Sequence, residues 1–185
     1  MMSKAIGIKV TKADGNYDLG ASKFFGAPVI PGEWQNIFSD TEMFFCQIKC
    51  DDIALLDVEN RLPHKGYLYV FLDIKSYPFK PRVLYYSGQP TIVVDDFNKD
   101  VPGAEHLTNE WLMSFEPADE AGDGIRLLGV PTDWNYAEPA PDVFMQYDPL
   151  EADMGFQDSV DGYVYLLFGE KSNDLGDITY REERS

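Results

Sequence analysis

The chain has 185 residues, of which 44% are hydrophobic and 14% aromatic, enough apolar side chain to build a sizeable core. This composition excludes a disordered chain, a collagen-like repeat and a disulfide-stabilised miniprotein. The formal net charge of −17 argues against nucleic acids and anionic membrane surfaces as partners, because both are bound by clustered Lys and Arg.

The start of the chain and its two cysteines indicate a compartment. Residues 1–12 lack the continuous apolar run of a secretory signal, and no stretch reaches the roughly 18 apolar residues of a membrane helix. Cys46 and Cys50 would lie about 13 Å apart on a strand, too far to share one metal ion. We therefore expect a cytoplasmic protein with two buried, reduced thiols, no membrane contact, and no metal or other cofactor.

Most segments of the first half read as turns and strands. Gly and Pro residues punctuate 26–32 and predict an irregular, turn-rich start. Residues 44–49 alternate with a partly polar face, and residues 66–72 are apolar on both faces, which is typical of a central strand. Residues 82–86 predict a third strand, and residues 50–60 can form a short helix.

An acidic segment rich in Gly and Pro follows and reads as a linker. It covers residues 88–124 and includes a second candidate helix over 103–115, with His106 or Leu107, Trp111 and Phe115 on one face. The run of residues 119–124 suggests calcium at first sight, but it lacks the alternating ligands and terminal Glu of an EF-hand loop. We interpret it as a solvated acidic loop.

The chain then repeats itself, which is the strongest pattern in the sequence. The matched segments lie at offsets of 103, 99, 96, 96 and 95 residues, and they are, in order, 23–28 with 126–131, 44–48 with 143–147, 66–72 with 162–168, 75–76 with 171–172, and 83–85 with 178–180. Offsets that fall steadily indicate matched elements joined by shortened loops. The sequence therefore predicts two copies of one antiparallel β unit, residues 22–87 and 125–181, joined by the acidic insert 88–124. We expect a mainly β domain over residues 1–185 with a few short helices, an α+β fold being the alternative.

The same residues carry a family resemblance. The run Ser22-Lys23-Phe24-Phe25-Gly26-Ala27-Pro28-Val29-Ile30-Pro31, followed by Trp34, resembles the opening motif of the YwqG-like family, a bacterial domain of unknown function. The strand Phe45-Cys46-Gln47-Ile48, the turn Leu62-Pro63-His64-Lys65-Gly66 and the strand Tyr67-Leu68-Tyr69 continue the likeness. Two departures are Phe25, where the family favours a second Gly, and Asp158-Ser159-Val160-Asp161, where it carries Trp-Gly-Asp. The resemblance implies a duplicated, mainly β, cytosolic protein with no established activity and a conceivable immunity-type binding role.

Residues that would carry chemistry are few. The two histidines, His64 and His106, have no nucleophile at a known spacing, and neither a Gly-x-Ser-x-Gly elbow nor a phosphate-binding loop is present. A triad can still assemble in space from distant residues. We expect a non-catalytic protein, with a hydrolase that uses a spatially assembled site as the alternative.

Four polar residues recur in both copies and form a candidate binding site. Lys23 and Arg126 precede equivalent Gly-x-Pro turns, and Gln47 and Gln146 occupy equivalent positions in apolar strands. A buried Gln without hydrogen-bond partners would cost about 1–3 kcal/mol. Either each Gln ties its strand to a loop and each base caps loop carbonyls, or the four side chains surround a cleft on a pseudo-twofold axis.

The negative charge lies entirely in one half of the chain. Residues 1–92 hold ten bases and ten acids, whereas residues 93–185 hold five bases and twenty-two acids. Such a field accelerates encounter with a basic protein, and apolar anchors would hold the complex. The residues that we expect at this surface are Asp119, Asp123, Trp111, Trp134 and Tyr136. The alternative is a structural domain with no specific partner, whose acids keep it in solution.

Overall fold

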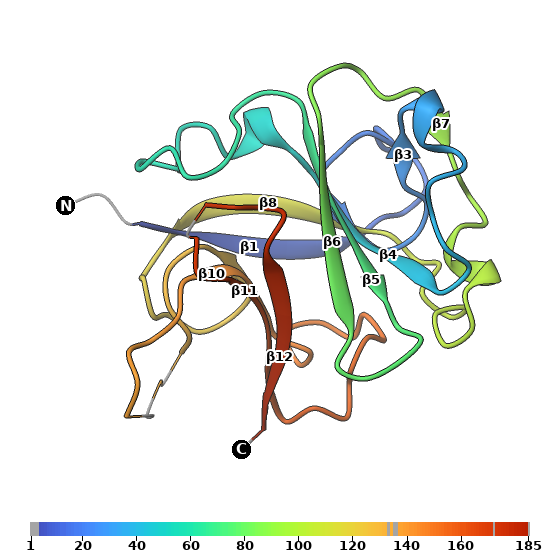
Figure 1. Ribbon diagram of the computed structural model, residues 1–185. Coiled ribbons are helices and arrows are strands. Elements are labelled where there is room, and N and C mark those ends of the chain that lie inside the picture. The colour runs from blue at the N-terminus through green and yellow to red at the C-terminus, as the bar shows by residue number, and fades with distance from the viewer. Residues whose placement is uncertain (1–3, 133, 135–136, 172, 185) are drawn as a thin grey trace.

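The computed structural model describes residues 4–132, 134, 137–171 and 173–184, which fold as a mainly β protein (Figure 1). Within these residues, ten strands form one antiparallel sheet and two form another. The strands are β1 Ala5–Lys12, β2 Lys23–Phe24, β3 Val29–Ile30, β4 Glu42–Lys49, β5 Tyr67–Asp73, β6 Lys80–Tyr86, β7 Ile92–Val93, β8 Trp111–Ala118, β9 Arg126–Leu127, β10 Val143–Tyr147, β11 Gly162–Phe168 and β12 Ile178–Arg184. The described helices are short 3₁₀ turns, η1 Gly32–Trp34, η2 Cys50–Asp52 and η3 Asn98–Asp100. The mainly β prediction is confirmed.

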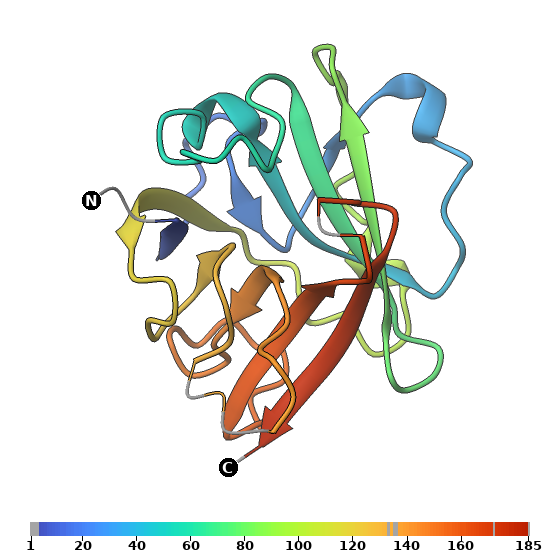
Figure 2. The same ribbon diagram turned by 60° about the vertical axis from the view of Figure 1, so that its left-hand side comes forward.

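The strand order of the large sheet is symmetric about the central pair of strands, β1 and β8. Its order is β12-β11-β10-β9-β1-β8-β2-β4-β5-β6, so that β5 lies between β4 and β6 just as β11 lies between β10 and β12. Two strands from outside the repeated units lie between the halves: β1 pairs with β9 of the second copy, and β8 pairs with β2 of the first. The eight-residue pairing of β1 with β8 joins the halves at the centre of the sheet. Figure 2 shows the strands of the two copies gathered on opposite sides.

Both copies carry a bulge at the same place. The pairing of β4 shifts between Phe44 and Cys46, and that of β10 shifts between Val143 and Met145. In β4 the bulge directs two consecutive residues, Phe45 and Cys46, into the interior cluster, and Phe144 and Met145 do the same in β10. The Gln that follows each pair is thereby returned to the outer face of the sheet.

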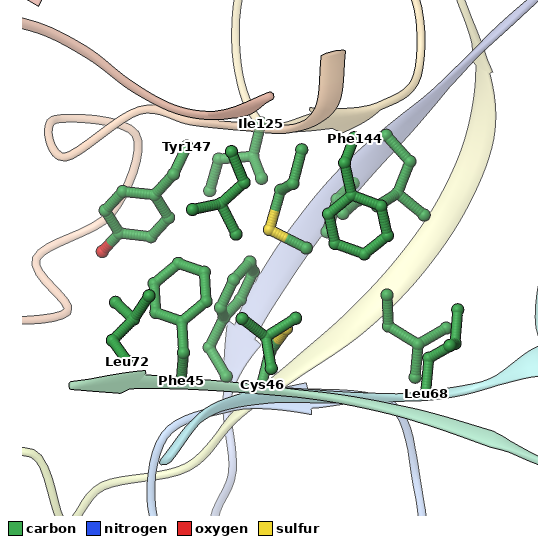
Figure 3. Packing of buried hydrophobic residues seen from close by; sticks show 14 of the residues in the cluster. Phe45, Cys46, Leu68, Leu72, Ile125, Phe144 and Tyr147 are labelled. Carbon is green, nitrogen blue, oxygen red and sulfur yellow. The ribbon is translucent and has the colours of Figure 1, made fainter. Parts of the chain in front are cut away.

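The principal core lies between the two copies, inside the curved sheet. Figure 3 shows Phe45, Cys46, Leu68 and Leu72 of the first copy facing Ile125, Phe144 and Tyr147 of the second. The rings of Phe45 and Tyr147 meet edge to face at 5.4 Å between centroids, a favourable aromatic geometry. Each large side chain buried here contributes about 1.5–3 kcal/mol. Cys46 and Cys50 are buried free thiols, as predicted, and burial raises the pKa of Cys50 to about 12.

The helix expected over residues 103–115 is absent from the described structure, and that prediction was wrong, whereas the one expected within residues 50–60 is limited to the 3₁₀ turn η2. Residues 111–118 form β8, in which Trp111, Met113 and Phe115 pack against the interior cluster with a period of two. The insert 88–124 is therefore no simple linker, because it supplies a central strand of the sheet. Residues 50–60 contain η2 and turns, because the Asp57 carboxylate accepts backbone N–H groups farther along the chain and Asn60 adopts a left-handed conformation.

The edges of the large sheet meet at the start of β6 and of β12. The Tyr77 hydroxyl, just before β6, donates to Glu182 Oε2 at 3.0 Å, and the Tyr180 hydroxyl donates to Glu182 Oε1 at 2.7 Å. The Phe79 and Tyr180 rings contact each other at 5.1 Å between centroids. These contacts bring the sheet close to a closed barrel. Within the described residues, no helix has the length and apolar character needed to cross a membrane.

Two buried tyrosines give a stability prediction. The Tyr69 hydroxyl donates to the Val29 carbonyl at 2.6 Å, whereas the buried Tyr147 hydroxyl has no hydrogen-bond partner among the described residues. Tyr69→Phe is expected to lower the free energy of unfolding by about 1–2 kcal/mol, because it orphans a buried carbonyl. Tyr147→Phe removes an unsatisfied hydroxyl and should leave stability unchanged or raise it by up to about 1 kcal/mol. Urea denaturation of both variants checks this, and equal losses would contradict it.

Candidate functional site

The four repeated polar residues form two equivalent pairs. Lys23 lies opposite Gln47 across β2 and β4, and Arg126 lies opposite Gln146 across β9 and β10. All four side chains are buried, and they face away from the core because their strand neighbours point into it. The two pairs thus occupy corresponding positions in the two halves of the strand order.

The Gln47 amide connects β4 to the loops of the first copy. Its Nε2 donates to the carbonyls of Leu19 and Ala21, both at 3.0 Å. Its Oε1 accepts from the Val29 N–H at 3.0 Å. All of these partners belong to the segments that precede and follow β2, so the side chain fixes both loops to one strand.

The Gln146 amide does the same in the second copy, with Arg126 added. Gln146 Nε2 donates to the carbonyls of Gly122 and Gly124 at 3.2 and 2.8 Å, and its Oε1 accepts from the Thr132 N–H at 3.2 Å. The guanidinium of Arg126 donates to Gln146 Oε1 at 2.8 Å. The remaining guanidinium bonds go to the carbonyls of Gly122, Leu128 and Val130 and to the Thr132 hydroxyl. Burial lowers the pKa of Arg126, but a guanidinium stays charged at neutral pH.

Lys23 is bound differently from its counterpart. Its ammonium pairs with the Glu110 carboxylate, which also accepts from the Tyr17 hydroxyl and, at 3.2 Å, from the Ala27 N–H. Burial lowers the pKa of Lys23 to about 8, against the opposing field of Asp18, and burial likewise raises the pKa of Glu110. Sequence reasoning missed Glu110, because it lies 87 residues from Lys23 and outside the repeat.

The two pairs have separate hydrogen-bond partners in the described structure. Gln47 bonds the loops beside β2, Gln146 and Arg126 bond the loops beside β9, and Lys23 bonds Glu110. The geometry therefore matches the interpretation in which each Gln ties its strand to a loop and Arg126 caps loop carbonyls. Lys23 departs from it, because its partner is a carboxylate.

The expected acidic residues line a different feature. Asp119 and Asp123 share a shallow hollow of about 330 Å³ with Glu116, at the end of β8 and the start of the second copy. The Tyr163 hydroxyl donates to Asp123 at 3.3 Å, and Lys9 forms an ion pair with Glu116 at 3.9 Å. Among the described residues, no cluster of three or more His, Cys, Asp or Glu side chains could hold a metal ion. The hollow is thus a carboxylate-lined surface.

The aromatic residues expected at the acidic surface do not lie together in the structure. Trp111 packs against the interior cluster, and its indole N–H is buried without an acceptor among the described residues, so it belongs to the core. Trp134 lies by the edge strand β12, with the Arg181 guanidinium 5.0 Å from its ring centroid and its Nε1 donating to the Glu138 carbonyl at 3.0 Å. Tyr136 lies outside the described residues.

The histidines occupy separate positions. His64 contacts Asp57 at 3.0 Å, and the Asp57 carboxylate also accepts the backbone N–H groups of residues 61 and 62, which is how an Asp stabilises a turn. His106 Nε2 donates to the Gly155 carbonyl at 2.8 Å and lines a hollow of about 220 Å³ with Asp158 and Ser159.

Comparison with known proteins assigns neither a family nor an activity. No protein-family model matches the chain, and no curated protein matches it in sequence. A functional conclusion therefore depends on the residues and the geometry described above.

Proposed function

We propose that this is a non-catalytic binding protein whose carboxylate-lined hollow binds a basic partner protein. The observation that carries the proposal is the gathering of Glu116, Asp119 and Asp123 around one hollow of about 330 Å³. Carboxylates that converge on an open surface attract Lys and Arg side chains, and their field accelerates encounter. The proposal places the protein in the cytoplasm.

The distribution of charge supports this choice of surface. Residues 93–185 carry twenty-two acids and five bases, and one of those bases, Arg126, is buried within its own network. Residues 93–100 belong to the first copy's side, where the Asn98 side chain bonds the backbone of Phe44. The strands β9 to β12, which belong to the acidic half that supplies Asp119 and Asp123, gather on one side of the molecule (Figure 2).

Membership of the YwqG-like family is part of the same proposal. Phe25 and Gly26 both have positive φ, 58° and 78°, and the equivalent Leu128 and Gly129 have φ of 65° and 83°. A left-handed residue at the position of Phe25 explains why a motif would favour Gly there. The family resemblance extends the proposed role to an immunity-type protein that binds a toxin.

A hydrolase is the second candidate. The observation that favours it is the hollow shared by His106, Asp158 and Ser159, which contains the residue types of a triad. Because His106 Nε2 donates to a carbonyl, its Nδ1 is left as the proton acceptor. A screen with ester, phosphate and glycoside substrates tests this candidate, and a real activity must disappear in Ser159→Ala.

The proposed binding function predicts a salt-dependent complex. Affinity capture from an extract of the native cell should recover a basic protein at low salt and lose it at high salt, because surface charges are screened. The double variant Asp119→Asn/Asp123→Asn should recover several-fold less of it. Quantitative mass spectrometry of the captured proteins provides the measurement.

A matched control variant distinguishes the effect of this surface from the effect of lowering the net charge. Glu33→Gln/Asp40→Asn also removes two negative charges, from exposed positions of the first copy, and should recover as much partner as the original protein. Capture of nothing, or of a partner indifferent to salt and to the Asp119 and Asp123 changes, would contradict the proposal and favour a structural domain with no specific partner.

A further inference from the structure

The two copies satisfy a buried cation at one equivalent position in different ways. Arg126 and Lys23 occupy matching places in β9 and β2, and both side chains are fully buried. Arg126 is satisfied by the carbonyls of Gly122, Leu128 and Val130 and by the Gln146 side chain. Lys23 instead pairs with Glu110, which lies just before β8 and outside both repeated units. The first copy thus holds a cation whose counter-charge is supplied from elsewhere in the chain.

Three donors of different kinds converge on the Glu110 carboxylate. They are the ammonium of Lys23, the hydroxyl of Tyr17 and the backbone N–H of Ala27, which lies 3.2 Å from Oε2. The Lys23 side chain is 0% exposed and that of Glu110 is 17% exposed. The carboxylate therefore enters from the solvent side into a buried pocket formed by Lys23, Tyr17, Gly26 and Ala27, which we call the cradle. Charge-assisted bonds of this kind are among the strongest that a carboxylate accepts.

The wall of the cradle is a glycine for a steric reason. Gly26 has φ of 78°, and a Cβ built on it would lie 2.1 Å from Glu110 Cγ and 2.7 Å from Cδ. The space that a side chain would fill is taken by the terminal atoms of Glu110. The first copy therefore has a pocket shaped around a carboxylate and the carbon attached to it.

We propose that Lys23, Tyr17, Ala27 and Gly26 form a carboxylate-binding site that the protein's own Glu110 fills as an internal ligand. Its ligands are monocarboxylates with a small group next to the carboxyl carbon. Glu110 is tethered beside the site, so its effective concentration is high and it excludes free carboxylates from the intact protein. A competing carboxylate gains access when Glu110 is removed or displaced.

Truncation of Glu110 tests this directly. Glu110→Ala deletes Cγ and the carboxylate, the same group of atoms that acetate supplies. Thermal unfolding of this variant at pH 7 should show a midpoint that rises with the logarithm of the sodium acetate concentration once this exceeds the dissociation constant, while sodium chloride of equal ionic strength has little effect. Because acetate has only four non-hydrogen atoms, its dissociation constant should be no lower than about 0.04 mM, and the rise should begin at or above that concentration. Pivalate is too bulky for the cradle and should behave like chloride.

Two further variants make the outcome specific. Glu110→Gln fills the cradle with an uncharged group of the same shape, and the double variant Lys23→Met/Glu110→Ala removes the ammonium, so neither should respond to acetate. The original protein should not respond either, because Glu110 occupies its site. Equal responses to acetate and chloride in Glu110→Ala, or an acetate response that persists without Lys23, would overturn the proposal. A Glu110→Ala protein that stays unfolded in both salts would also overturn it, because a preformed cradle should recruit acetate and restore folding.

Discussion

Replacing Arg126 with methionine is expected to lower the free energy of unfolding by roughly 3–5 kcal/mol, which is a large part of the stability of a domain this size. The variant keeps much of the side-chain volume but removes all the guanidinium donors. The carbonyls of Leu128 and Val130 and the Oε1 of Gln146 then lose a buried hydrogen bond. Because these groups fix the loop between β9 and β10, the second copy loses its connection to that loop.

Lys23→Met is the matched control for this prediction. It also removes a buried cation from the equivalent position, but the Glu110 carboxylate that it leaves behind is partly exposed and keeps the Tyr17 and Ala27 bonds. We expect about half the loss seen for Arg126→Met. Arg126→Lys should recover little, because an ammonium cannot reproduce the forked geometry of a guanidinium. Urea denaturation measures all three, and a loss in Arg126→Met no larger than in Lys23→Met would contradict the argument.

Gly129→Ala is expected to destabilise the protein by more than about 3 kcal/mol, through two effects that add. The residue has φ of 83°, where a Cβ costs about 1–2 kcal/mol. Its new Cβ would also lie 2.3 Å from the carbonyl oxygen of Glu120, which is backbone and is held by the Val130 N–H at 2.9 Å. Relief of that overlap requires the loop before β9 to move.

Gly15→Ala isolates the first of these effects. Gly15 has φ of 97°, and a Cβ there would meet nothing within 4 Å, so conformational strain alone should cost about 1–2 kcal/mol. Thermal and urea unfolding of the two alanine variants provide the comparison. Similar losses for Gly15→Ala and Gly129→Ala would mean that the Glu120 carbonyl yields freely, and would refute the steric part of the prediction.

Local patterns in the sequence were sufficient to predict the strands with strong alternation. The apolar faces of residues 66–72 and the repeated Gln in each copy placed β5, β4 and their counterparts correctly. The segment 111–118 was misread because Leu107, Trp111 and Phe115 also fit a helical spacing, while the period of two that β8 uses begins only at Trp111. A short apolar run of this kind favours both structures until its strand partners are known.

Of the polar sites too, some features could be predicted from the sequence and others could not. The equivalence of Lys23 with Arg126 and of Gln47 with Gln146 is visible in the sequence, because both members of each pair follow the same motif. The role of Glu110 is not visible, since no spacing rule connects a residue before β8 with one in β2. Asp119 and Asp123 share a surface because they lie four residues apart in one loop, whereas Trp111 was assigned to that surface from its place in the chain and lies instead against the core.

The pairing of β1 with β8 and β9, which lie about 100 residues farther along the chain, has a consequence for biosynthesis. Strand β1 leaves the ribosome first, yet its partners in the sheet are residues 111–118 and 126–127. At a synthesis rate of about 5–20 residues per second, its backbone waits roughly 5–20 s before a partner exists. The first copy likewise lacks its neighbour β8 until more than half of the chain has been made. Assembly of the centre of the sheet is thus deferred until β8 has been made, and until then the nascent chain carries β1 as an unpaired apolar strand.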